Sequence, residues 1–244
     1  MTNLYFFRHG QAGTRGSYDS LSELGRRQAR LLGEHFAEQG VEFAAVYAGA
    51  LTRQRQTAAE VAAAYAEAGL AFPEPSVDAG WDEFDFHRIY GELAPLMCED
   101  DEEFRQEFEE VSAELSASAG DHGADVHSSW RASDTKVVEA WVGGRYPYAG
   151  ETWGQFLARV SACRPCADGS AKEPRENVAV FTSATPTAIW TGMALGITDG
   201  RLFRLAGVLE NTSYTVLRLR GEETLLLTFN AVPHLRSPEL RTRR

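Results

Sequence analysis

The spacing of hydrophobic and polar residues predicts strands that alternate with helices in the first third of the chain. An apolar run over 3–7 predicts a buried strand, and leucine and phenylalanine at helical spacing predict a helix over 19–40. A second strand is expected over 43–48, followed by an alanine-rich helix over 52–69. This order is typical of an α/β fold with a mostly parallel sheet.

The pattern changes after Trp81, and residues 84–148 contain no convincing strand. The segment 98–115, "CEDDEEFRQEFEEVSAEL", predicts an acidic amphipathic helix. A small, polar stretch over 116–129 predicts a loop, and 129–142 can form another helix. We interpret residues 84–148 as a helical insertion or lid within one domain, which we expect to comprise the whole chain, 1–244.

The alternation of helix and strand resumes after the insertion. Helices are expected over 151–163 and 186–196, and strands over 177–182, 214–220 and 224–230. The expected helix over 186–196 opens on a proline, which suits the first helical position. Together the elements predict a three-layer α/β/α sandwich with a mostly parallel central sheet and a helical insertion.

Composition narrows the classes of partner. The 244 residues carry a net charge of −11, which argues against nucleic acid and against an anionic membrane surface as partners. No apolar run is long enough to span a bilayer, and no signal peptide is expected from the N-terminal residues. Three cysteines do not form a disulfide framework, so we expect a cytoplasmic protein.

Residues able to carry chemistry follow several of the predicted strands. Arg8 and His9 follow the first strand, Arg53 follows the second, and Ser183 follows the strand over 177–182. Glu83 follows a further possible strand, "PSVDAGW". Ligands of open α/β sheets bind beyond the carboxyl ends of the strands, so we expect these side chains to converge on one rim.

The ordered set resembles the histidine phosphatase superfamily, the phosphoglycerate-mutase-like group. The resemblance rests on "FFRHG" at the first strand end, "LSELGRRQA" at the first helix and "VYAGALTRQRQTAA" around the second arginine. It continues in "WDEF", "GETWGQFLAR", "NTSYTVLRL" and "FNAVPHL", so it runs along most of the chain. A lone Arg-His-Gly is weak evidence for the family, whereas the ordered set of motifs is a specific signal for it.

The resemblance implies a phosphatase that needs neither a metal nor another cofactor. His9 would be the nucleophile, because a neutral imidazole with a pKa of about 6.5 can accept a phosphoryl group. Arg8, Arg53, Gly10 and Ser183 would hold the phosphate, and Glu83 would act as general acid and then as base. The substrate would be a phosphorylated small molecule or a phosphoprotein. Taken singly, Arg8, Arg53 and Glu83 also fit ordinary surface positions.

Ser183 departs from the family pattern, which has a second histidine at this point. Serine donates a hydrogen bond but cannot supply the charge of a protonated imidazole. Losing a charged hydrogen bond of about 1.5–3 kcal/mol predicts a rate about 10- to 150-fold lower. Two functions therefore stay open. The chain is either a slow phosphatase or a catalytically weak pseudo-phosphatase that binds a phosphorylated ligand or protein.

His87 lies four residues after Glu83, so a helix through "DEFDFHRIY" would place both on one face. One hypothesis is that His87 partly replaces the missing imidazole, and the plainer alternative is a surface histidine on the lid. His234 is expected to be structural. His122 and His127 alone provide too few ligands for a metal.

Cys163 and Cys166 form a C-x-x-C pair at the end of the helix over 151–163. Redox motifs of this kind open a helix, where the dipole lowers the pKa of the first thiol. The reversed order predicts that the spacing is coincidental, and a redox protein is the remote third function.

Overall fold

The computed structural model describes residues 1–13, 19–117, 131–163, 176–197, 200–221 and 223–243. His122, His127 and Cys166 lie outside the described residues. The strands are β1 (Thr2–Arg8), β2 (Ala45–Ala48), β3 (Ser76–Val77), β4 (Glu176–Thr182), β5 (Tyr214–Arg220) and β6 (Glu223–Ala231). The α-helices are α1 (Glu23–Glu38), α2 (Thr52–Glu67), α3 (Phe86–Asp100), α4 (Glu102–Ala117), α5 (Ala132–Val142), α6 (Trp153–Ala162), α7 (Ala184–Leu195) and α8 (Leu202–Ala206).

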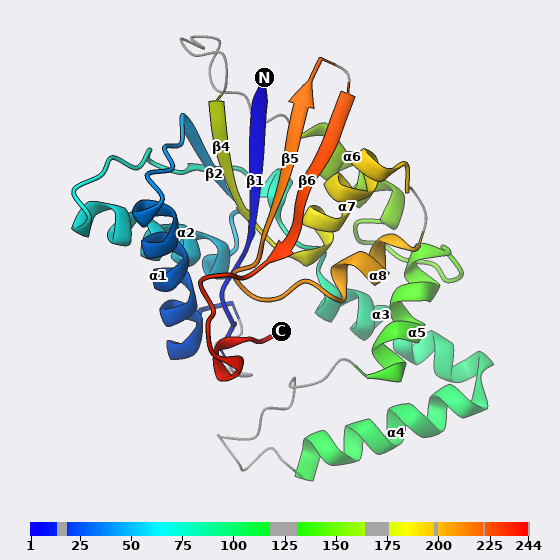
Figure 1. The fold of residues 1–244 in the computed structure, drawn as a ribbon. Coiled ribbons are helices and arrows are strands. Elements are labelled where there is room, and N and C mark those ends of the chain that lie inside the picture. Colours follow the sequence, from blue (N-terminus) through cyan, green and yellow to red (C-terminus); the bar gives the residue numbers. More distant parts are fainter. Residues whose placement is uncertain (14–18, 118–130, 164–175, 198–199, 222, 244) are drawn as a thin grey trace. The chain divides into compact units, whose positions relative to one another are not determined.

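The strands form one mixed sheet in the order β3-β2-β4-β1-β5-β6. Parallel pairs join β3 to β2, β2 to β4 and β4 to β1, whereas β5 is antiparallel to β1 and to β6. Only β5 therefore runs against the others, and the predicted mostly parallel sheet is confirmed. Helices α1 and α2 cover one side of the sheet and α7 and α8 the other, which confirms the three layers (Figure 1).

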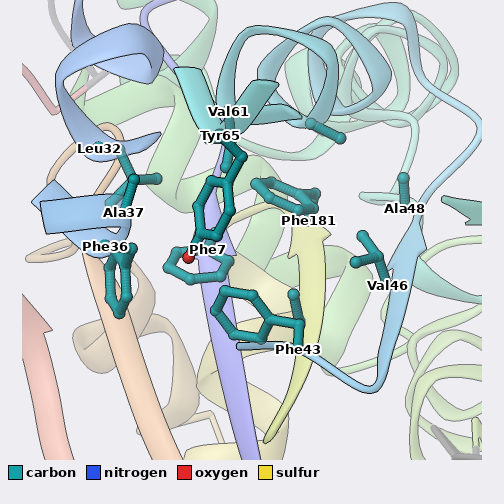
Figure 2. Close-up of a cluster of buried hydrophobic side chains, with 12 residues drawn as sticks. Phe7, Leu32, Phe36, Ala37, Phe43, Val46, Ala48, Val61, Tyr65 and Phe181 are labelled. Atoms are coloured by element: carbon teal, nitrogen blue, oxygen red, sulfur yellow. The ribbon is translucent and has the colours of Figure 1, made fainter. Parts of the chain in front are cut away.

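Alternation along β1 divides the core between the two faces of the sheet. Phe7 packs with residues of α1 and α2 in the buried cluster of Figure 2, where it stacks on Phe181 of β4 with ring centroids 5.0 Å apart. Phe6 points the other way and lies 5.7 Å from the ring of Trp190 in α7. Burying each such side chain contributes about 1.5–3 kcal/mol, so the aromatic run fixes β1 as a central strand.

Helix α7 begins earlier than the proline predicts. Ser183 is its N-cap and Ala184 its first residue, which makes Pro186 the third helical position. The predicted start at Pro186 is wrong because the first turn of any helix has N–H groups without intrahelical acceptors, so proline fits at its later positions too. The earlier start places Ser183 at the junction between β4 and α7.

The chain divides into two compact units, one made of Met1–Glu83 with Val160–Arg244 and the other of Phe84–Arg159. In the second unit α3 packs with α5 and α4, and Phe84, Trp141 and Phe156 form an aromatic cluster with ring centroids 5.0–6.1 Å apart. The role of the insertion as a lid stays a prediction. None of the helices in the described ranges has the length and apolar character needed to cross a bilayer.

Helix α3 corrects the hypothesis for His87. The helix begins at Phe86, with Asp85 as its N-cap, and Glu83 precedes it, outside the helix. Glu83 and His87 therefore do not share a helical face, and the premise of a relocated imidazole is wrong. The side chain of Asp85 accepts the amide hydrogen of Arg88 at 3.0 Å, which explains why the helix starts after this residue.

Candidate active site

His9 is the first residue beyond β1, and its backbone is held on both sides. Its amide donates to the carbonyl oxygen of Thr182 at 2.9 Å, which extends the parallel pairing of β1 with β4 by one residue. Its carbonyl oxygen accepts from Nδ2 of Asn211 at 3.1 Å. With only 5% of its surface exposed, His9 is a buried residue in a fixed backbone position.

The hydrogen bonds of the His9 ring determine its tautomer. Nδ1 lies 2.8 Å from the carbonyl oxygen of Gly10, and a carbonyl oxygen only accepts, so Nδ1 carries the hydrogen. Nε2 then holds the lone pair and accepts from Nε of Arg53 at 3.2 Å. Burial lowers the pKa of His9 well below 6.5, and the charges of Arg53 and Arg8 lower it further. The ring is therefore neutral at pH 7, with a nucleophilic Nε2.

Arg53 is positioned by the first turn of α2. The N-cap residue, Leu51, has no side-chain acceptor, so two carboxylates from elsewhere cap the helix. Oδ1 of Asp82 accepts the amide hydrogens of Ala50 and Leu51, at 2.6 and 3.2 Å. Oδ2 of Asp19 accepts that of Thr52 at 3.1 Å. Anionic groups at a helix N-terminus are stabilising, so both carboxylates fix the turn that carries Arg53.

Both predicted arginines are buried, with 8% of the surface of each exposed. Nη1 of Arg53 pairs with Oδ1 of Asp19 at 3.0 Å, and Nη1 of Arg8 donates to the carbonyl oxygen of Leu209. A buried guanidinium is unfavourable unless hydrogen bonds and charge partners compensate it. The alternative that Arg8 and Arg53 are ordinary surface residues is therefore wrong.

Gly10 lies where the loop after β1 meets the first turn of α1. Its amide donates to Oγ1 of Thr57 at 3.0 Å. A Cβ on Gly10 would overlap the carbonyl oxygen of Gly25, and a Cβ on Gly25 would overlap that of Gln11. Both glycines are needed because two backbone segments approach each other too closely for any side chain. This contact fixes the loop that carries the Gly10 carbonyl, and with it the His9 ring.

Ser183 and Glu83 meet at the start of α7. Ser183 is 1% exposed and follows Thr182, the register partner of Arg8, so it lies beside His9 along the sheet edge. Its Oγ accepts from Nε2 of Gln54 at 2.9 Å. Oε2 of Glu83 accepts the amide hydrogen of Thr185 at 3.0 Å. The carboxylate of Glu83 thus occupies one of the free amides in the first turn of α7.

His234, for which we expect a structural role, follows β6 at this edge of the sheet. His234 is 6% exposed, and its Nε2 lies 3.0 Å from Oγ1 of Thr212. Burial, with a smaller effect of His35, lowers the pKa of His234 to about 3. Among the residues that the structure describes, no three His, Cys, Asp or Glu side chains gather as a metal site would require.

Among the residues expected from the sequence, Arg53 and Gly10 contact the His9 ring directly. Arg8 precedes His9, Ser183 lies beside it by strand register, and Glu83 bonds the amide of Thr185, two residues after Ser183. Sequence reasoning missed the groups that hold them, namely Asp19, Gln54, Thr57, Asp82 and Asn211. Thr57 follows Arg53 by four residues on α2, so helical spacing could have placed both on one face. Asp19, Asp82 and Asn211 belong to other segments, and only the folded chain brings them to the site.

Comparison with known proteins gives the chain a family. The model of the histidine phosphatase superfamily (branch 1) matches residues 4–133 and 117–232. No curated protein matches the chain. Solved structures do: YhfR of Bacillus stearothermophilus has a TM-score of 0.61 at 19% identity, over 96% of this chain and 100% of its own.

Two further structures share the fold. The putative α-ribazole-5′-phosphate phosphatase of Escherichia coli has a TM-score of 0.57 at 18% identity, over 95% of this chain and 98% of its own. The mycobacterial glucosyl-3-phosphoglycerate phosphatase, solved with VO3, has a TM-score of 0.58 at 22% identity, over 94% and 99%. The family model covers nearly the whole chain, with His9 and both buried arginines inside its range, so this chain belongs to the histidine phosphatase superfamily.

Proposed function

We propose that the chain hydrolyses a phosphomonoester through a phosphohistidine on Nε2 of His9. The observation that carries this proposal is the tautomer, since Gly10 holds the hydrogen on Nδ1 and leaves the Nε2 lone pair facing Arg53. Membership of the family supports it, and so do the names of two structural relatives, which are a putative phosphatase and a phosphatase.

In the first step Nε2 attacks phosphorus and the bond from phosphorus to the ester oxygen breaks. Glu83 gives its proton to the leaving alcohol, which departs with the electron pair of that bond. Arg8 and Arg53 hold the equatorial phosphoryl oxygens, because planar guanidinium groups match that geometry and keep their charge. A covalent intermediate divides one difficult transfer into two easier ones.

In the second step water attacks the phosphohistidine. Glu83 accepts a proton from the water, the bond from phosphorus to Nε2 breaks, and the electron pair returns to the imidazole. Inorganic phosphate is the product, and the site is restored. Gly10 contributes in both steps because its carbonyl oxygen keeps the hydrogen on Nδ1, and no metal or other cofactor enters the mechanism.

Ser183 takes the position of the second family histidine in this proposal. Its hydroxyl donates to the transferring phosphoryl group but adds no positive charge, so we infer turnover about 10- to 150-fold below that of a site with an imidazole there. The same substitution favours a second candidate function. A pseudo-phosphatase would use Arg8 and Arg53 to bind a phosphorylated ligand or protein without turning it over.

The substrate class is a phosphorylated small molecule or a phosphoprotein. The net charge of −11 repels polyanions over the surface as a whole, so binding relies on the local charge of the two buried arginines. Nucleic acid and anionic membranes are therefore not proposed as partners. A cytoplasmic location is part of the same proposal.

Hydrolysis of an aryl phosphate by the wild type and by two variants, His9→Ala and Ser183→His, tests the proposal. We expect measurable turnover in the wild type, none in His9→Ala, and a gain in Ser183→His. A wild type that binds inorganic phosphate but releases no product would support the pseudo-phosphatase instead. Turnover that persists in His9→Ala would contradict a phosphohistidine intermediate on His9.

A further inference from the structure

Gln54 is buried beside the candidate nucleophile and has no role in the mechanism above. It is 0% exposed and directly follows Arg53 on α2. Its Nε2 donates to Oγ of Ser183 at 2.9 Å and to the carbonyl oxygen of Trp81 at 3.3 Å. A backbone carbonyl accepts only, so the Trp81 contact fixes which end of the amide is nitrogen.

This orientation restricts the Ser183 hydroxyl. A hydroxyl has one hydrogen and two lone pairs, and one of these lone pairs receives the Gln54 N–H. The hydroxyl does not cap α7 as an N-cap serine commonly would. Its hydrogen must therefore point away from Gln54, and the donated hydrogen bond polarises the O–H and strengthens it as a donor.

The other end of the Gln54 amide indicates that the residue is not there for stability. Among the described residues, nothing donates to Oε1 of Gln54, which is buried. This oxygen lies so close to Gly49 that a Cβ at position 49 would overlap it. A buried acceptor without a donor destabilises the fold, and an apolar side chain of the same length would avoid that penalty.

We propose that Gln54 is a positioning residue that orients the Ser183 hydroxyl as a hydrogen-bond donor to the phosphoryl group on His9. Ser183 is placed for this by strand register, because the amide of His9 bonds the carbonyl of Thr182 at 2.9 Å. Gln54 is placed by its neighbour, Arg53, whose Nε reaches the His9 ring at 3.2 Å. The inference rests on the proposed function.

A double-mutant cycle with Gln54→Met and Ser183→Ala tests it on the full chain. We expect kcat for an aryl phosphate to fall about 5- to 30-fold in Gln54→Met and about 10- to 150-fold in Ser183→Ala, with KM changed less than about 3-fold. In the double variant kcat stays within about 2-fold of Ser183→Ala, because the hydroxyl through which Gln54 acts is gone.

Gln56→Met is the matched control, since Gln56 lies on the same helix and accepts the Leu21 amide hydrogen at 2.8 Å through Oε1. We expect its kcat to match that of the wild type. The thermal midpoint gives a second readout. It should be equal or higher in Gln54→Met, because the variant removes the unpaired oxygen, whereas a structural role predicts that stability and kcat fall together.

Equal losses of kcat from Gln54→Met in the wild-type chain and in the Ser183→Ala variant would overturn the inference, as would a lower midpoint that accounts for the loss. Failure of the proposed function has a different signature: the wild type then shows no His9-dependent turnover, because it is inactive or is as active as His9→Ala. In that case, calorimetric measurement of orthovanadate binding tests the role of Gln54 without relying on turnover. Gln54→Met should weaken this binding about 3- to 30-fold and add nothing to Ser183→Ala, whereas affinity equal to that of the wild type would reject the role.

Discussion

Nε of Arg53 donates a hydrogen bond to Nε2 of His9 across 3.2 Å. The guanidinium of a proposed phosphate clamp thus rests on the lone pair of the proposed nucleophile. A phosphoryl group entering at Nε2 must take over this contact, so that Arg53 exchanges the ring nitrogen for a phosphoryl oxygen. The same pairing orients the ring before substrate arrives, which reduces the reorganisation needed during the reaction.

Replacing Arg53 by lysine tests whether the shape of the cation matters beyond its charge. Lysine keeps the positive charge but loses the planar group that reaches both the ring and the Asp19 carboxylate. We expect kcat/KM for an aryl phosphate to fall about 10- to 150-fold. Arg55→Lys on the same helix is the control, and equal activity of both variants would contradict the clamp.

The protonation state of His9 can be measured directly. Burial lowers its pKa below 6.5, with Arg53 and then Arg8 adding to the effect, so the ring should stay neutral as pH falls from 7 to 5.5. NMR of protein labelled in histidine, assigned with His9→Ala, should reveal no titration of His9 in this window. Arg53→Gln removes one positive neighbour and should raise the pKa of His9. A midpoint near 6.5 in the wild type would refute the buried, neutral ring.

His234 makes the stability of the fold depend on pH. Its pKa is about 3 in the folded chain and about 6.5 when unfolded. Between these values the unfolded state binds one more proton, so stability is fully retained above pH 6.5 and falls as pH drops towards 3. From pH 7 to pH 5 the wild type should lose about 2 kcal/mol more than His234→Gln does. Urea unfolding at both pH values checks this, and parallel losses would contradict it.

Glu83 combines a proposed proton transfer with a contact at the start of α7. Glu83→Gln keeps an oxygen for the Thr185 amide but cannot transfer a proton, so stability should hold while kcat falls. The loss should be larger for an alkyl phosphate than for an aryl phosphate, whose leaving group needs less help. Glu83→Ala should in addition destabilise the fold by about 1 kcal/mol. Equal kcat losses on the two substrates would argue against a general acid.

Gly25 should be intolerant of a side chain although it is remote from the chemistry. A Cβ there overlaps the backbone oxygen of Gln11, in the loop that follows Gly10, so Gly25→Ala should lose about 1–3 kcal/mol of stability and lower kcat. Gly91→Ala is the control, because Gly91 is helical and a Cβ there meets nothing within 4 Å. That variant should gain about 0.5–1 kcal/mol, and a stable, fully active Gly25→Ala would disprove the close approach.

The local sequence pattern did not predict helix α3 along its full length. A helix around His87 was expected only conditionally, through "DEFDFHRIY", whereas α3 extends over Phe86–Asp100 and includes Gly91 and Pro95. Packing against α4 and α5 outweighs the intrinsic penalty of these two residues. The hypothesis of His87 as a substitute imidazole depended on where this helix begins, which no propensity defines to within three residues.

The sequence by itself determined the α/β class, most of the strands and helices outside 84–148, and the residues at the strand ends. Those features follow from hydrophobic periodicity and from the rule that parallel strands bring their carboxyl ends to one edge. Only the tertiary structure decided how the groups meet. The tautomer of His9 depends on the Gly10 carbonyl and on Arg53, and the direction of the Ser183 hydroxyl depends on Gln54, which is 129 residues away. Hydrogen bonds between such distant segments exist only once the sheet has formed, so no local pattern in the chain encodes them.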